Sequence, residues 1–335
     1  MRYEATLEEW RELYEAAIKI KEMKPWEKLW DMDLITIIPD KKFEPIICSI
    51  MGKGGDFYGV GAYIGIDAIH DFFLMAESLE MPPDQLIRYQ KCIMYNLGDR
   101  EDLTKEEYDV IKKLGLKFRG KSNWIYFRVF DPIYVPFMPD KKEVLQMTEI
   151  LKQLYFALEA LNNGFNVDFE KGKTLLRRFD KESNSWVHQE MSVLMPEAEY
   201  QVPVLDDEVL IKRLRTQKSN KAILDLDIAH LNSSINDKKY DKPLAMRTCI
   251  LSDRKSGMVL SQHVMAQEDD EVDVLFTMVI NYILEIGIPK TICVRDEYMY
   301  SIIEDLCQRV GIDLKISQQL PAVDFFVERF NYFRY

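Results

Sequence analysis

Hydrophobic residues recur every three or four positions near the start of the chain and predict an amphipathic helix. The capping box Thr6-Leu-Glu-Glu9 precedes them, and the helix should end before Pro25. A second helical pattern runs over residues 143–161, with its leucines and isoleucine on one side. Both segments therefore predict helices that pack one face against a core.

Between and after these helices, β-branched and aromatic runs bounded by turn residues predict strands. The expected strands are residues 34–39 and 44–51 around a turn at Asp40, the aromatic run 124–137, and a hairpin over 174–194. A further helix is expected near residues 66–80. Residues 1–200 should thus form an N-terminal α+β domain.

The glycine-rich stretch Gly52-Lys-Gly-Gly-Asp-Phe-Tyr-Gly-Val-Gly61 invites comparison with a phosphate-binding loop. It matches neither G-x-x-x-x-G-K-[ST] nor a strand, G-x-G-x-x-G and helix unit, because Lys53 lies between glycines. A turn or bulge that needs glycine is the simpler interpretation.

Apolar periodicity weakens between Pro196 and Lys221, which places a domain boundary there. The segments beyond it, in order, are a strand at 221–228, a hairpin at 246–265, a helix at 272–285, a strand at 292–294, a helix at 299–310, a strand at 314–317 and a helix at 323–333. A meander followed by a β-α-β unit predicts a mixed sheet with helices on its faces. The second domain should span residues 201–335.

Composition narrows the class of protein. The 335 residues are 47% hydrophobic and carry a net charge of −12, which is unfavourable for a protein that coats nucleic acid. The N-terminal residues lack the apolar core of a signal peptide, so we expect the protein to stay in the cytoplasm. No apolar run is long enough for a membrane helix.

The five cysteines form no C-x-x-C pair and should be buried thiols. One dense basic run, Lys212 to Lys221, is expected to be a solvated linker or helix face.

Carboxylates follow the predicted strands of the second half. Asp225 and Asp227 alternate with apolar residues on the first strand, Asp296 follows Ile292-Cys-Val-Arg, and Glu328 lies on the last helix. Converging carboxylates are the ligands of a two-metal phosphoryl-transfer site, so these four are candidate ligands of Mg²⁺ or Mn²⁺.

Each candidate also has a simpler interpretation. Asp296 has the position of a helix N-cap, the two strand carboxylates alternate like the solvent face of a half-buried strand, and Glu328 has that of a surface residue of an amphipathic helix. His230, alone beside a strand end, is more simply a structural residue.

The order of elements and these residues resemble the ribonuclease H-like fold, most closely the catalytic core of retroviral integrases and DDE transposases. Leu226-Asp227-Ile-Ala-His230 resembles the family's first acidic strand, Asp296 its second aspartate, and Val327-Glu328-Arg329 its glutamate. The resemblance implies a catalytic set of Asp227, Asp296 and Glu328, with Asp225 or Asp324 as substitute metal ligands. Where the family has glycine-containing loops, this sequence has Glu297-Tyr298 and Gln318-Gln-Leu-Pro321.

The first 200 residues resemble a domain of bacterial proteins of unknown function, through Lys24-Pro-Trp-Glu-Lys-Leu-Trp30 and Tyr58-Gly-Val-Gly-Ala-Tyr-Ile-Gly65. Two functions are therefore expected. One is a divalent-metal-dependent nuclease or related phosphoryl-transfer enzyme acting on nucleic acid. Its N-terminal half would select a protein partner or the substrate. The alternative is a non-catalytic protein-interaction module that keeps the ribonuclease H-like fold.

Overall fold

The computed structural model describes residues 3–39, 44–197, 199–235 and 240–332. The chain divides into two compact units, which are described separately below. Unit 1 comprises Met1–Leu74 and Tyr89–Glu197, and unit 2 comprises Met75–Arg88 and Ala198–Tyr335. Unit 2 therefore includes a short segment taken from the middle of the N-terminal half, which the sequence pattern did not assign to it.

Unit 1 contains a mixed sheet in the order β6-β5-β4-β3-β2-β1-β7-β8. Its strands are β1 Ile35–Ile38, β2 Ile46–Met51, β3 Tyr58–Ile64, β4 Cys92–Gly98, β5 Trp124–Asp131, β6 Tyr134–Phe137, β7 Lys173–Asp180 and β8 Ser185–Ser192. Neighbours are antiparallel except β1 and β7, which are parallel. The predicted hairpin is β7–β8, and the turn at Asp40 lies outside the described residues.

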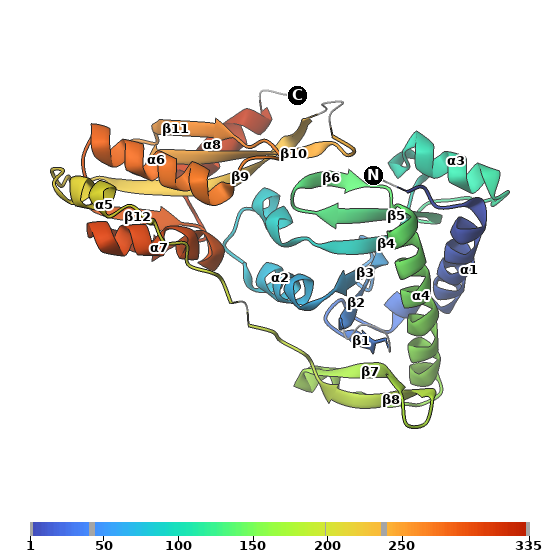
Figure 1. Cartoon of the computed structure of the whole chain (residues 1–335). Helices are drawn as coiled ribbons and strands as arrows, with labels where there is room; N and C mark the ends of the chain where they lie inside the picture. The colour runs from blue at the N-terminus through green and yellow to red at the C-terminus, as the bar shows by residue number, and fades with distance from the viewer. Residues whose placement is uncertain (1–2, 40–43, 198, 236–239, 333–335) are drawn as a thin grey trace. The chain divides into compact units, whose positions relative to one another are not determined.

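Helices of unit 1 cover this sheet. They are α1 Leu7–Met23, α2 Ile66–Glu77, α3 Lys105–Lys113 and α4 Lys141–Asn162. The predicted capping box begins α1, where the Thr6 side chain accepts from the Glu9 N–H and the Glu9 carboxylate accepts from the Thr6 N–H. Helices α1 and α4 lie side by side (Figure 1) and share one core with the strands. The aromatic run 124–137 contributes Ile125 and Phe127 to that core.

The glycine stretch is only partly a turn. Gly52 and Gly55 have φ of 130° and 92°, as a glycine-dependent turn requires. From Tyr58 onward, however, the chain forms strand β3, where Gly59 pairs with Asn96 of β4. A Cβ on Gly59 would lie 2.5 Å from the Tyr95 carbonyl oxygen. This glycine therefore permits close strand packing rather than anion binding.

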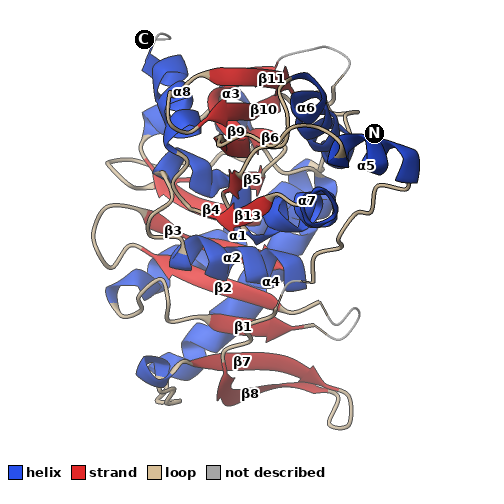
Figure 2. Cartoon of the chain, turned by 90° about the vertical axis from the view of Figure 1, so that its left-hand side faces the viewer, coloured by secondary structure: helices blue, strands red, loops and turns tan. Residues whose placement is uncertain are grey.

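Unit 2 contains a smaller mixed sheet in the order β11-β10-β9-β12-β13. Figure 2 shows β11, β10 and β9 one after another. Its strands are β9 Ile223–Ile235, β10 Leu244–Asp253, β11 Val259–Val264, β12 Thr291–Val294 and β13 Asp313–Ile316. The first three are antiparallel, whereas β12 pairs with β9 in parallel and β13 pairs with β12 in parallel. The predicted meander followed by a β-α-β unit is present, and the mixed α+β class is confirmed.

Helices cover both faces of the unit 2 sheet. They are α5 Glu208–Arg215, α6 Glu271–Glu285, α7 Glu297–Val310 and α8 Pro321–Tyr332. Leu224 and Leu226 of β9 pack with α5, α6 and α7, whereas Ala229 and Leu231 pack with α8. Because side chains alternate along a strand, Asp225 and Asp227 belong to the α8 face. The basic run expected to be a linker or helix face begins in the last turn of α5 and continues beyond its end.

All five cysteines are buried thiols, as predicted. Within the described ranges, no helix is both long and apolar enough to cross a membrane.

Replacing Gly59 by alanine should destabilise unit 1 by about 2 kcal/mol, because the new methyl group meets a backbone oxygen that cannot rotate away. All five tryptophans lie in unit 1, so tryptophan fluorescence during urea unfolding reports on this unit. Gly54→Ala is the matched control, since its Cβ would meet nothing within 4 Å. Equal stability of the two variants would contradict the packing assigned to β3 and β4.

Candidate functional site

Two of the predicted site residues, Asp225 and Asp227, are fully buried on strand β9. The expectation that they form a solvent-facing acidic side of the strand is therefore wrong. They lie on the face that α8 covers, where Ile250 pairs with Asp227 and Cys293 with Asp225 on the neighbouring strands. A buried carboxylate requires compensation, so its partners decide what it can do.

The Asp227 carboxylate binds two arginines. Arg88 donates to both of its oxygens, Nη1 to Oδ1 and Nη2 to Oδ2, each at 3.0 Å. Arg295, which is also fully buried, donates from Nε to Oδ2 at 2.6 Å. Paired donation from a planar guanidinium is among the stronger hydrogen-bond arrangements that a carboxylate makes in a protein. Both oxygens of Asp227 are thereby occupied.

Asp296 shares the same guanidinium. Its Oδ2 accepts from Arg88 Nη1 at 3.0 Å, while its Oδ1 accepts from the Met299 N–H and caps helix α7. The N-cap interpretation of Asp296 is thus confirmed. Arg88 lies between the two aspartates that the resemblance assigns to catalysis.

Two further ion pairs belong to the site, and the first of them reaches helix α8. Arg295 Nη2 donates to Asp324 Oδ1 at 2.6 Å, and Arg254 Nη1 lies 3.3 Å from Asp225 Oδ1. The Ala322 N–H, at the start of α8, donates to Asp225 Oδ2 at 3.3 Å. We define the arginine–carboxylate network as Asp225, Asp227, Asp296, Asp324, Arg88, Arg254 and Arg295.

Arg88 is the last residue of the segment Met75–Arg88, which belongs to unit 2. Gln85 of this segment pairs with the backbone of His230 on β9: its amide donates to the carbonyl and its oxygen accepts from the N–H, both at 2.9 Å. Arg88 Nη2 also donates to the Ile228 carbonyl at 3.3 Å. The segment is therefore bonded to β9 through backbone and side-chain contacts alike.

Burial and the arginines act in opposite directions on the two strand aspartates. Burial raises the pKa of Asp227, but Arg295 and Arg88 outweigh it and bring that pKa from 3.8 to about 2. Burial raises the pKa of Asp225 to about 6, because Arg254 and the Ala322 N–H compensate it only in part. The Asp227 carboxylate is therefore a stable anion in the folded protein, whereas the negative charge of Asp225 is compensated only in part.

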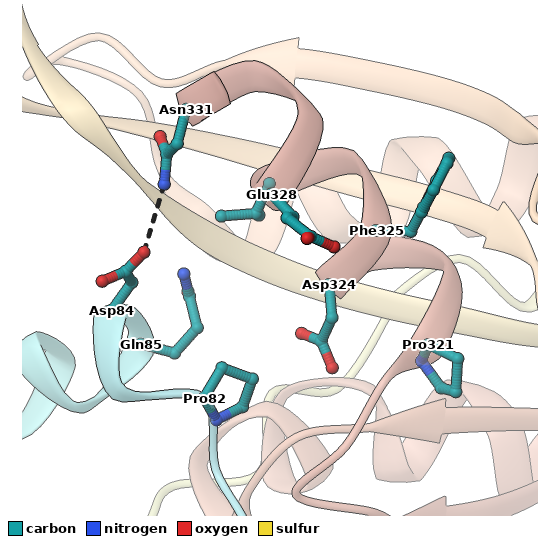
Figure 3. A pocket seen from close by; sticks show the side chains of 9 residues that line it. Pro82, Asp84, Gln85, Pro321, Asp324, Phe325, Glu328 and Asn331 are labelled. Atoms are coloured by element: carbon teal, nitrogen blue, oxygen red, sulfur yellow. Dashed lines mark hydrogen bonds between the residues drawn. The ribbon is translucent and has the colours of Figure 1, made fainter. Parts of the chain in front are cut away.

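Glu328 is not part of the network. It lies on α8 with its side chain exposed, as its surface interpretation predicted, and it lines a groove beside Asp324 (Figure 3). Of the catalytic set implied by the resemblance, Asp227 and Asp296 are brought together through Arg88, and Glu328 is separate from them.

The arrangement does not fit a divalent cation. A Mg²⁺ ion needs carboxylate oxygens that are free to coordinate it, and here those of Asp227 and Asp296 accept hydrogen bonds from arginines and a helix N–H. Among the residues whose placement is described, no three His, Cys, Asp or Glu side chains are grouped to hold a metal ion. The site for Mg²⁺ or Mn²⁺ remains a prediction from the sequence.

The sequence reasoning missed the arginines. Arg88 precedes its partners Asp227 and Asp296 by more than a hundred positions and lies in a segment with no motif, so nothing in the local pattern indicates it. Two features of the sequence could have indicated arginine partners. Asp225 and Asp227 alternate with leucine and isoleucine on an apolar strand, and Arg295 directly precedes Asp296. Buried aspartates of that kind require cations, supplied by metal or by arginine.

Unit 1 has a pocket of its own, of about 490 Å³, against helices α1 and α4. Its lining combines acidic, basic and aromatic side chains, including Glu12, Lys19, Lys152 and Phe156. Lys152 donates to Glu12 at 3.0 Å, so part of the lining charge is already paired. The pocket carries no group of side chains that specifies a chemistry.

Comparisons with known proteins give families without an assigned activity. Residues 10–177 match a family described as Domain of unknown function (DUF7309), and residues 210–331 match another, Domain of unknown function (DUF6930). No curated protein matches the chain. Among solved structures, the catalytic core domain of BIV integrase is similar at 16% identity and a TM-score of 0.24, covering 34% of this chain and 66% of that one.

Substituting the two strand aspartates should change stability in opposite directions at pH 8. Asp227→Asn should destabilise unit 2 by about 3 to 5 kcal/mol, because two buried arginines lose their anion. Asp225 has a folded pKa above its unfolded value, so unfolding free energy falls as the pH rises from about 4 to about 6. Asp225→Asn should remove this loss and stabilise unit 2 by about 3 kcal/mol at pH 8, with little effect at pH 4.

Amide hydrogen exchange of β9 measures the stability of unit 2 in both variants, since unit 2 contains no tryptophan that would report by fluorescence. Equal destabilisation by the two substitutions at pH 8 would contradict the assigned charge balance.

Proposed function

Because the chain belongs to the family described as Domain of unknown function (DUF7309), which assigns it no reaction, we propose from the geometry that unit 2 is a non-catalytic interaction module. The observation that carries this proposal is the Arg88 guanidinium, 3.0 Å from both Asp227 and Asp296. It supplies the positive charge that a metal ion would bring to these carboxylates. The network then serves to hold the module together.

Electrostatics supports this assignment. A divalent cation entering between Asp227 and Asp296 would have to displace a nearly buried guanidinium from paired hydrogen bonds. It would also leave that arginine charged, because a guanidinium does not lose its proton in a protein. The low pKa of Asp227, about 2, reflects how strongly the arginines already compensate its charge.

The competing function is a metal-dependent nuclease, and one feature favours contact with nucleic acid. Lys212, Arg213 and Arg215 of α5 are exposed, as are Lys218 and Lys221 beyond it. Basic side chains of this kind bind phosphates without sequence preference. They do not, however, provide the open carboxylate oxygens that metal-dependent cleavage needs, and so we rank this function second.

Calorimetric titration with Mg²⁺ and Mn²⁺ tests the proposal on the full chain, with cleavage of single- and double-stranded DNA and RNA assayed on the same samples. The wild type should show neither metal binding nor cleavage, because the oxygens of Asp227 and Asp296 already accept hydrogen bonds from arginines and a helix N–H. Arg88→Ala leaves Asp227 and Asp296 without their shared cation and should gain Mn²⁺ binding. Arg88→Lys is the control that keeps a positive charge and should remain without metal.

Metal binding by the wild type, together with cleavage that disappears in Asp296→Ala, would overturn the proposal and establish the nuclease instead. Thermal unfolding of each variant shows whether it is folded before its titration is interpreted.

A further inference from the structure

A groove of about 570 Å³ lies within unit 2, between residues 82–85 and helix α8 (Figure 3). Its lining consists of Pro82, Asp84, Gln85, Pro321, Asp324, Phe325, Val327, Glu328 and Asn331. Four of these side chains are apolar and three are acidic, and none of this lining is basic. The groove thus combines an apolar surface with negatively charged side chains.

The apolar surface is open to a ligand. Phe325 is 52% exposed, and prolines approach the groove from both of its sides. The Arg329 guanidinium lies 5.0 Å from the centre of the Phe325 ring, so this ring already accepts one cation. A side chain with an aliphatic stem and a cationic end matches such a surface.

The carboxylates differ in how far they are engaged. Asp324 accepts from Arg295 and from the Leu320 N–H, and Asp84 accepts from Asn331 at 3.2 Å. In the described part of the chain, Glu328 has no hydrogen bond or ion pair, and its side chain is exposed. Glu328 on one side and Asp84 on the other therefore offer negative charge to an incoming cation.

We propose that this groove docks an arginine-bearing segment of a partner protein, an inference that rests on the interaction function proposed above. The arginine stem lies over Phe325, and its guanidinium donates to Glu328 and Asp84. Charge complementarity favours this occupant over nucleic acid, whose phosphates the three carboxylates repel. Arginine suits the site because its planar group both pairs with carboxylates and stacks on aromatic rings.

Fluorescence anisotropy of a labelled hexa-arginine peptide against the full chain tests the proposal. Glu328→Lys, a change at an exposed position, should weaken binding about tenfold by reversing charge in the groove. Glu285→Lys is the matched control, because it makes the same charge change at an exposed position at the end of α6 and should alter affinity less than about twofold. Phe325→Ala should weaken binding about fivefold without changing charge.

Absence of hexa-arginine binding, or equal loss in Glu328→Lys and Glu285→Lys, would overturn the docking proposal, since the attraction would then be absent or a property of the whole acidic chain. Neither result bears on metal binding or cleavage. Metal-dependent cleavage by the wild type would instead refute the interaction function while leaving the peptide measurement valid on its own.

Discussion

The Asp227 carboxylate, buried between the guanidinium groups of Arg88 and Arg295, is the interaction on which unit 2 depends. It lies in the middle of the central strand β9, so removing its charge from water is costly unless cations accompany it. Each arginine then binds a second aspartate, Asp296 at the start of α7 and Asp324 on α8. The buried Asp227 carboxylate and its two arginines thereby connect β9, α7, α8 and the segment Met75–Arg88.

This arrangement also explains why a segment from the N-terminal half belongs to unit 2. Gln85 pairs with the His230 backbone and Arg88 with Asp227, so the segment is bonded to β9 at both places. Its Pro82 and Asp84 then form one side of the groove whose other side is α8. The same contacts that neutralise the acidic centre thus create the surface that we assign to a partner. The position of Arg88 therefore determines both the contacts of the acidic centre and the groove that we propose as the docking site.

Much of the fold could be predicted from the sequence because it depends on local patterns. The Thr6–Glu9 capping box, the β7–β8 hairpin and the order of elements in unit 2 all follow from periodicity and turn residues. Strand β3 was missed because its glycines resemble a turn, whereas their role is close contact with β4, which the sequence pattern also did not predict. For the site, the pattern identified Asp225, Asp227 and Asp296 but not their partners. Pairing Arg88 with Asp227 is a long-range contact, and hydrophobic periodicity contains no information about it.

A double-mutant cycle between Arg88→Met and Asp227→Asn, measured by hydrogen exchange of β9, tests the central claim most directly. If the two side chains form the buried pair described, their effects on the free energy of unfolding should be non-additive by about 2 kcal/mol. The methionine keeps the aliphatic bulk of Arg88 while removing its charge, so packing changes contribute little to the coupling. Effects that add within about 0.5 kcal/mol would show that Arg88 does not bind Asp227 in solution. The acidic centre would then be open, and the interaction function derived from its neutralisation would be refuted.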